Sequence, residues 1–212
     1  MAGCGVMDGS EIHEAVLTLL AIDRAGAEAI CLAPNIKQFH VVNHQSGEES
    51  KGEVRNVLTE SARITRGKVR DIASVKPAEL DALIFPGGFG AAKNLCDYAF
   101  KSTDCTINPD VARLAREIHA AAKPIGLVCI APVLAAKLLG TEHPQLTIGS
   151  DRNTANDIEK MGGQHVNCAA TDFVVDKHLK LVSTPAYMLA RSIKEVAEGI
   201  EKLVNAVLEL TA

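Results

Sequence analysis

The chain has 212 residues, of which 47% are hydrophobic and 23% charged, and its formal net charge is −4. This length and apolar content suit one α/β domain over residues 1–212 with a core of two or three layers. The slightly negative charge, the 3% aromatic content and the lack of tryptophan disfavour nucleic acid or an anionic membrane as a partner.

The six cysteines are widely spaced, which predicts free thiols in a reducing compartment. None forms a CxxC pair, and no cysteine–histidine cluster has the spacing of a zinc site. A chain with a proper core does not need a disulfide framework. We see no secretory signal, and apolar stretches such as residues 15–22 are too short to cross a membrane. These features predict a cytoplasmic protein without a bound metal.

Short apolar runs alternate with helical patterns along the chain. The runs are continuous, as in strands covered by helices on both faces, and predict an α/β fold with a mostly parallel sheet. We expect strands over residues 27–34, 81–88, 123–130, 145–150 and 179–185. We expect helices over residues 10–25, 54–66, 109–121 and 130–139, and a long amphipathic helix over about the last 20 residues.

The first predicted helix has clear boundaries, with Ser10 as the N-cap and Gly26 after its end. Only a stub precedes Gly3, although a full strand is expected before this helix. The apolar stripe expected to face the core consists of Ile12, Val16, Leu19 and Ile22, with Ala15 beside it.

Three further segments have recognisable local patterns. Asn108 and Pro109 mark the start of the helix over residues 109–121. The polar segment 43–54 predicts a loop or hairpin tip that could serve as a lid or a dimer contact. Residues 172–183 predict a β-hairpin that turns at residues 176–178.

The predicted strand order places several chemically capable groups on one edge of the sheet. In a parallel α/β sheet each strand-to-helix turn lies at the carboxyl edge, where binding sites collect. The turns after the predicted strands, together with the start of the first helix, bring Glu14, Gly88, Cys129 and Thr184 to this edge. This placement follows from the predicted fold and does not by itself indicate catalysis.

Cys129 stands where a strand is expected to turn into a helix, the position of the nucleophile in a strand–nucleophile–helix elbow. Ala131 is small enough for this turn, whereas Leu127 is larger than an elbow prefers. Pro132 falls in the first helical turn, where its missing N–H is not needed. A thiol at a helix N-terminus has a lowered pKa. A buried structural cysteine is the alternative, and the local sequence favours neither.

Glu14 lies near the amino end of the first predicted helix and is a candidate acid or base. A carboxyl group that reaches over the sheet edge toward Cys129 could hydrogen-bond the thiolate or move a substrate proton. The alternative is an ordinary first-turn acid that the helix dipole favours, an explanation that covers Glu11 equally well.

The glycine-rich stretch PGGFGAAKN (86–94) follows a strand and opens a helix. It could form an anion-binding loop, with the backbone N–H groups of Gly88 and Ile130 directed at one oxyanion. A dinucleotide-binding loop is the alternative. However, Lys93 stands where such a loop has its third small residue, and the acidic residue expected after the next strand is absent. We therefore expect no nicotinamide cofactor.

No histidine is expected at the carboxyl end of a strand, so a complete Cys-His-acid triad is not visible. His13 neighbours Glu14 but is expected to point elsewhere on the helix. Cys4 lies on the same edge and is either core packing or a second reactive thiol.

Several stretches together resemble the PfpI-like class I glutamine-amidotransferase superfamily. Within it they resemble the ElbB-like branch, named for enhanced lycopene or isoprenoid biosynthesis. They run over nearly the whole chain, and PGGFGAAKNL with CIAP is the most specific combination. The other matching stretches are GCGVMDGSEIHEAVLTLL, RNVLTESARITRGKV, LTIGSD and TPAYML.

The resemblance implies a flavodoxin-like three-layer sandwich, usually dimeric, with a nucleophile elbow. It maps the nucleophile onto Cys129, the glutamate of the first helix onto Glu14, and the oxyanion donors onto the Gly88 and Ile130 backbone. It also implies a modest glyoxalase activity without a cofactor, glyoxal to glycolate, and a protein- or metabolite-repair role. The expected partner is a small aldehyde, and the other candidates for its pocket are Cys4, Asn94 and Thr184.

The chain departs from the superfamily after the strand that follows the elbow. Many members carry a histidine there, whereas this chain has Ser150 and Asp151. This departure disfavours a strong hydrolase or amidotransferase activity. Two alternatives to a glyoxalase stay open: a cysteine amidase or hydrolase with a histidine base, and a non-catalytic stress protein that senses oxidants through Cys129.

Overall fold

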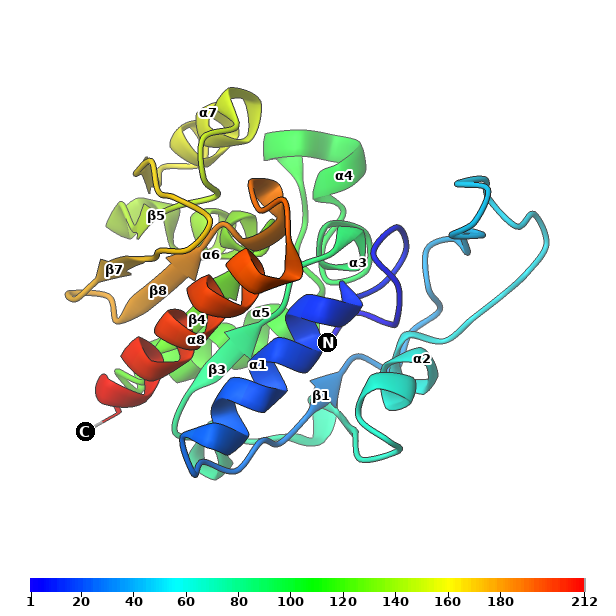
Figure 1. Ribbon diagram of the computed structural model, residues 1–212, viewed down its shortest axis with the longest axis horizontal. Coiled ribbons are helices and arrows are strands. Elements are labelled where there is room, and N and C mark those ends of the chain that lie inside the picture. The colour runs from blue at the N-terminus through cyan, green and yellow to red at the C-terminus, as the bar shows by residue number, and fades with distance from the viewer. Residues whose placement is uncertain (212) are drawn as a thin grey trace.

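The computed structural model describes residues 1–211, and its centre is a four-stranded sheet with the order β3-β4-β8-β7 (Figure 1). Strands β3, β4 and β8 are parallel, and β7 pairs antiparallel with β8. Two smaller parallel sheets, β1-β2 and β5-β6, lie on either side. The strands are β1 (Leu32–Ala33), β2 (Arg70–Asp71), β3 (Leu83–Phe85), β4 (Ile125–Val128), β5 (Gln145–Leu146), β6 (Gln164–His165), β7 (Val174–Asp176) and β8 (Leu181–Thr184).

Helices cover both faces of the central sheet, which confirms the α/β fold with mostly parallel strands and flanking helices. In Figure 1, α1 (Ile12–Arg24) and α8 (Ile193–Glu209) lie side by side in front, with α5 (Pro109–Ala120) and α6 (Pro132–Leu139) behind. The shorter α-helices are α2 (Val57–Ile64), α3 (Phe89–Lys93), α4 (Tyr98–Lys101) and α7 (Arg152–Lys160). Single 3₁₀ turns cover Ile72–Ser74, Pro77–Glu79, Ser102–Asp104, Gly140–Glu142 and Ala186–Met188.

The core explains why the strand sequences are continuously apolar. Every residue of β4 and of β8 is buried, because helices pack on both sides of these strands. On one side, Leu114 and Ile118 of α5 are completely buried in the larger cluster; on the other, Ile200 and Leu203 of α8 are completely buried in the smaller one. Burying such a side chain stabilises the fold by about 2 kcal/mol.

Two predicted local structures are confirmed with their capping groups. Asn108 is the N-cap of α5, and its side-chain oxygen accepts hydrogen bonds from the Asp110 and Val111 N–H groups at 3.0 and 3.2 Å. The hairpin over residues 172–183 is the β7-β8 pair. The Asp176 carboxylate accepts hydrogen bonds from the two N–H groups of its turn, at residues 178 and 179.

The predicted buried face of the first helix is partly wrong: Ala15 is buried and Leu19 and Ile22 are half-buried, but the first two apolar positions are exposed. Ile12 and Val16 are 41% and 46% exposed, whereas the buried residues of α1 are Glu14, Ala15, Thr18 and Ala21. The small alanines allow close packing, and the buried polar groups find hydrogen-bond partners, so side-chain polarity alone misidentified the buried face. The predicted N-cap is also wrong: the Glu11 carboxylate caps the Glu14 N–H at 2.7 Å, while the Ser10 hydroxyl accepts from Ala2.

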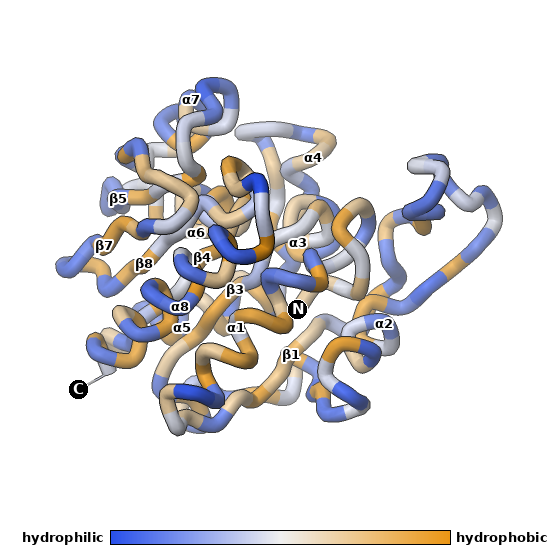
Figure 2. The backbone as a smooth tube through the Cα atoms, in the orientation of Figure 1, coloured by the Kyte–Doolittle hydropathy of each residue, from blue (hydrophilic) through white to orange (hydrophobic). Residues whose placement is uncertain are grey.

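Helix α7 was not among the predicted elements. Ile158 is its one buried residue, so the helix has no apolar stripe for a periodicity argument to detect. Figure 2 shows this contrast, with hydrophilic residues along α7 and hydrophobic residues along β3.

The polar segment 43–54 extends from the body of the molecule as a long loop (Figure 1). A single antiparallel bridge between Val42 and Glu49 ties its base. Its role as a lid or dimer contact stays a prediction, as does the homodimer itself. Among the helices within residues 1–211, none has the length and apolar character needed to span a bilayer.

Candidate functional site

Cys129 lies immediately after β4, at the turn that leads into α6, and has the backbone geometry of an elbow. Its φ is +61°, a value that a side-chain-bearing residue adopts at a cost and that is concentrated at functional sites. The Cys129 N–H donates to the Thr184 carbonyl at 2.9 Å, which extends the β4-β8 pairing up to the elbow. Only 8% of the residue is exposed. The turn therefore holds the thiol at the carboxyl edge, largely shielded from solvent.

Glu14 of α1 reaches this thiol from a position far away in the sequence. Its carboxyl group lies beside the Cys129 side chain, since a Cβ added at Gly87 would stand 2.6 Å from Glu14 Oε2 and 2.4 Å from the Cys129 Cβ, and Glu14 is completely buried. Two backbone groups hold the carboxylate in place: the Gly87 N–H donates to Oε2 at 3.1 Å and the Tyr187 N–H donates to Oε1 at 3.2 Å. The structure therefore brings the acid and the thiol together, as the strand order predicted, and their catalytic roles stay predictions.

Burial controls the ionisation of this pair. Burial, and then the nearby charge of Glu11, raise the pKa of Glu14 from 4.5 to about 7. Burial and the negative charge of Glu14 raise the pKa of the Cys129 thiol well above its usual value, against the lowering effect of the Gly88 and Ile130 N–H groups. Both shifts favour the protonated forms of the two groups, so the thiol becomes a nucleophile only when a base accepts its proton.

The glycine-rich stretch forms the loop between β3 and α3, and it packs against the start of α1. The Glu11 N–H donates to the Gly87 carbonyl at 3.0 Å, and the Gly90 N–H donates to the Gly9 carbonyl at 2.8 Å. Gly88 has a φ of +93°, and a Cβ there would lie 2.3 Å from the Glu11 nitrogen. Only glycine permits this approach, which directs the Gly88 N–H toward the sulfur.

The remaining candidates already have hydrogen-bond partners or neighbours within the fold. The buried Thr184 hydroxyl donates to the Asp172 carbonyl at 2.7 Å. The buried Asn94 amide donates to the Ala2 and Asp8 carbonyls, and its oxygen accepts from the Phe39 N–H. The half-buried Cys4 has a pKa raised by burial and by the charge of nearby Glu60. Their roles in a substrate pocket stay predictions.

The sequence interpretation missed Tyr187 and misjudged His13. The ring nitrogen Nδ1 of His13 lies 2.7 Å from the Tyr187 hydroxyl, and the ring centroids are 5.8 Å apart. His13 therefore faces the residue whose N–H holds Glu14, although we expected it to point elsewhere. The position of Tyr187 just after β8, at the same carboxyl edge, was the available signal.

Outside this site, the described part of the chain holds free cysteines and no cluster of metal ligands. All six cysteines are free. Within residues 1–211, no group of three or more histidine, cysteine, aspartate and glutamate side chains could hold a metal ion. The groups that shift the pKa of the Cys129 thiol are Glu14 and the N–H groups of Gly88 and Ile130, and no histidine is among them.

The raised pKa of Glu14 makes a prediction about stability. The folded protein binds the Glu14 proton more tightly than the unfolded chain, so this group stabilises the fold below pH 4.5 and loses that contribution as pH rises through about 7. We expect a loss of about 3 kcal/mol over this range. Urea denaturation at a series of pH values measures it. Glu14→Gln should flatten the decline, whereas Glu28→Gln should keep it; an unchanged slope in Glu14→Gln contradicts the prediction.

Comparison with known proteins identifies relatives over the full chain, although no family model matches. The chain is 48% identical to a human protein described as "Glutamine amidotransferase-like class 1 domain-containing protein 3, mitochondrial", covering all of this chain and 81% of that protein. It is 46% identical to the "ES1 protein homolog, mitochondrial" of Rattus norvegicus and 34% identical to the "ES1 protein, mitochondrial" of Danio rerio, covering 82% and 84% of them.

These relatives correct one expectation from the sequence. We expected a cytoplasmic protein, and all three similar proteins are described as mitochondrial. That expectation rested on free thiols and on seeing no secretory signal, and these features do not distinguish one reducing compartment from another.

Solved structures agree with this relationship. The structure of an isoprenoid biosynthesis protein with an amidotransferase-like domain from Ehrlichia chaffeensis has a TM-score of 0.93 and 43% identity, covering all of this chain and 96% of that one. Drosophila melanogaster DJ-1beta, with a TM-score of 0.52 and 17% identity, shares the fold. The chain therefore belongs to the ES1-like, isoprenoid-biosynthesis branch of the DJ-1/PfpI class I glutamine-amidotransferase superfamily.

Proposed function

We propose that this protein is a glyoxalase that converts glyoxal to glycolate through a covalent intermediate on Cys129. The close approach of the buried Glu14 carboxyl to the Cys129 side chain, both packed against Gly87, carries this proposal. It supplies a nucleophile and a base whose pKa is near neutrality, the condition for efficient proton transfer at physiological pH. The conversion moves hydrogen between two carbons of one molecule, so it needs no external oxidant or reductant.

The first step forms a hemithioacetal. The Cys129 sulfur adds to one aldehyde carbon of glyoxal, and the thiol proton passes by way of Glu14 to the aldehyde oxygen. The Gly88 and Ile130 N–H groups, which already point at the sulfur, lie close to where negative charge develops on that oxygen. Glu14 is again a carboxylate when this step ends.

The second step moves a proton between the two carbons. Glu14 removes the C–H proton from the carbon bonded to sulfur, giving an enediol, and returns a proton to the neighbouring carbon. The product is a thioester of glycolate. Water then adds to the thioester carbon, the bond to sulfur breaks, and the thiol regains its proton. The sum is glyoxal plus water giving glycolate, so atoms and electrons balance.

The geometry gives less support to the two alternatives. An amidase needs a histidine base within reach of the thiol, whereas the groups within residues 1–211 that shift the pKa of Cys129 are Glu14, Gly88 and Ile130. A redox sensor needs an exposed thiol with a low pKa, whereas Cys129 is buried with a raised pKa. We also propose that the protein acts in mitochondria, as the descriptions of its three relatives suggest.

The proposed route predicts the isotope content of the product in D₂O. A proton held by Glu14 exchanges with solvent, so glycolate should carry deuterium on its CH₂ carbon, detected by proton NMR. Transfer of a hydride directly between the carbons would leave that position free of deuterium and would remove Glu14 from the route. If the protein produces no glycolate above a buffer control containing free thiol, the proposed function itself is wrong.

A further inference from the structure

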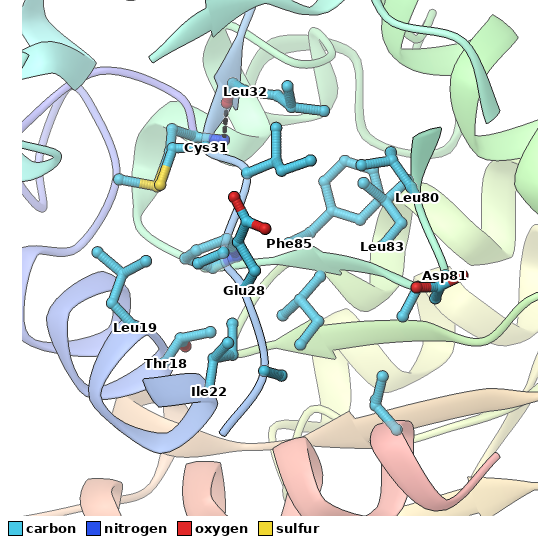
Figure 3. A pocket seen from close by; sticks show the side chains of 18 of the residues that line it. Thr18, Leu19, Ile22, Glu28, Cys31, Leu32, Leu80, Asp81, Leu83 and Phe85 are labelled. Carbon is cyan, nitrogen blue, oxygen red and sulfur yellow. Dashed lines mark hydrogen bonds between the residues drawn. The ribbon is translucent and has the colours of Figure 1, made fainter. Parts of the chain in front are cut away.

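The first turn of α1 meets the turn that follows β8 beside the candidate site. The middle of the helix, at Thr18 and Leu19, lines an apolar pocket toward β1 and β3 (Figure 3). The first turn instead carries His13 and Glu14, and both of these residues contact Tyr187. The proposed reaction uses the Glu14 carboxyl and gives no role to the side chains of His13 and Tyr187.

Tyr187 binds two neighbouring residues of α1. Its backbone N–H donates to Glu14 Oε1 at 3.2 Å, and its hydroxyl lies 2.7 Å from the ring nitrogen Nδ1 of His13. Within residues 1–211, these are the two hydrogen bonds that join α1 to the turn over residues 185–188. One leaves from the main chain of Tyr187 and the other from the end of its side chain, so together they fix how the turn lies against the helix.

The turn after β8 is strained at Ala186. This buried alanine has a φ of +44°, in the left-handed region that a residue with a Cβ adopts at a cost. Such a conformation persists only where the surrounding structure enforces it, and it is concentrated at functional sites. Cys129 has the same feature, with a φ of +61°, and its N–H donates to Thr184, two residues before Ala186. Two adjacent strand ends therefore both leave the sheet through a strained turn.

The peptide group that joins Ala186 to Tyr187 is held at both of its ends. The Ala186 carbonyl accepts hydrogen bonds from the Leu189 and Ala190 N–H groups at 3.1 and 2.9 Å, and the N–H of the same peptide group donates to Glu14. Hydrogen bonds in such a chain strengthen one another. The bond to Glu14, at 3.2 Å, is at the long end of the normal range, so a small rotation of this peptide group would break it.

The titratable neighbours of Glu14 are Glu11 on its own helix, Cys129 at the elbow and Tyr187 in the turn. Burial and then the charge of Glu11 raise the pKa of Glu14, and the Tyr187 N–H acts in the opposite direction. Burial and the charges of Glu11 and Glu14 raise the pKa of Tyr187, so its hydroxyl keeps a proton to donate to His13.

From these contacts we infer that Tyr187 and His13 are positioning residues of the site. Their side chains tie the turn after β8 to α1, and the tied turn holds the Glu14 carboxyl beside Cys129. The inference rests on the proposed function for the use of Glu14 as a base, but it concerns the carboxyl itself. When the tie is cut, the Tyr187 N–H moves away from the carboxylate. A donor that favours the charged form is then lost, so the pKa of Glu14 rises.

The test measures the pKa of Glu14 in the full chain by ¹³C NMR of the glutamate carboxyl carbons over a series of pH values. The signal of Glu14 is the one that disappears in Glu14→Gln. Tyr187→Phe removes only the hydroxyl and should raise the pKa of Glu14 by about half a unit or more, a change of about threefold in its acid dissociation constant. The acid side of the pH profile of kcat/KM for glyoxal should move to higher pH by the same amount.

Variants of His13 test the other end of the tie from an exposed position. His13→Leu should raise the pKa of Glu14 as much as Tyr187→Phe does. His13→Asn should leave it near its original value, because the amide oxygen can accept the tyrosine hydroxyl in place of Nδ1. Combining Tyr187→Phe with His13→Leu should shift the pKa no further than either change alone, since both remove the same bond.

The matched control is Tyr98→Phe, at the other of the two tyrosines in the chain. The Tyr98 hydroxyl donates to the Asp157 carboxylate at 2.8 Å, between α4 and α7. Its removal also deletes one tyrosine hydrogen bond, but it should leave the pKa of Glu14 and the pH profile unchanged.

Three results would overturn the positioning role. An unchanged pKa of Glu14 in folded Tyr187→Phe or His13→Leu would show that the contact only stabilises the fold. An equal shift in Tyr98→Phe, or additive shifts in the double variant, would also contradict it. If Tyr187→Phe does not fold, His13→Leu decides the question alone. Absence of glycolate production by the original protein would refute the proposed function instead, because the NMR titration needs no substrate.

Discussion

Replacing Cys129 with serine is expected to lower kcat/KM for glyoxal by about a thousandfold or more. A hydroxyl gives up its proton far less readily than a thiol, and the Glu14 base, with a pKa of about 7, is too weak to ionise it. The substitution changes one atom in a buried turn, so the fold should persist. Steady-state production of glycolate measures the effect, and urea denaturation verifies that both proteins are folded.

The matched control for this prediction is Cys168→Ser. Cys168 is half-buried, and its charged neighbours are Asp172 and Lys202 rather than the groups around Cys129. Its loss should leave turnover within about twofold of the original protein. Undiminished glycolate production by Cys129→Ser, with a folded protein, would show that the thiol is not the nucleophile. An equal loss in both variants would point to a general effect of removing a thiol.

Replacing Gly87 with alanine is expected to disrupt both the fold and the site. The added Cβ would lie 2.4 Å from the Cys129 Cβ, 2.6 Å from Glu14 Oε2 and 2.9 Å from the Val128 carbonyl oxygen. Two of these atoms belong to the backbone or are attached directly to it, so they cannot move aside without displacing the elbow. We expect a loss of about 3 kcal/mol in the free energy of unfolding. Glycolate production should fall as well, because the thiol and the carboxyl are pushed apart.

Gly126→Ala serves as the control for this prediction because it lies on the strand that leads to the elbow. A Cβ there would contact side-chain ends of Ile84, Leu203 and Val207, all at 3.1 Å. Such groups can shift by a few tenths of an ångström, so we expect a loss of about 1 kcal/mol or less. Equal losses in the two variants, measured by urea denaturation, would contradict the special role of Gly87.

The local chemistry of the elbow could be predicted from the order of the residues. A strand followed by Cys129, with the small Ala131 and then Pro132 in the turn, favours an elbow, and parallel strands place their carboxyl ends together. The same reasoning predicted that Glu14 and the Gly88 N–H lie near the sulfur of Cys129, and the structure places them there. It was sufficient because it needed only the direction of each strand and the sequence position of each turn.

The buried face of α1, and the backbone N–H groups that hold the Glu14 carboxyl, could not be predicted in this way. Apolar periodicity pointed to Ile12 and Val16, yet the helix buries Glu14, because N–H groups of Gly87 and Tyr187 satisfy its carboxyl group. The contact between His13 and Tyr187 joins α1 to a turn near the other end of the chain. The position of Tyr187 just after a strand indicates its edge of the sheet, but the sequence does not indicate which residue of α1 it contacts.

The sequence by itself therefore determined the α/β fold, the superfamily, and the edge of the sheet where a thiol and an acid would meet. These depend on local patterns and on chain direction, which neighbouring residues specify. Only the tertiary structure decided which face of α1 is buried and which groups hold the Glu14 carboxyl. The reason is that burial and pKa depend on groups distant in the chain, and their separation becomes known only once the chain is packed.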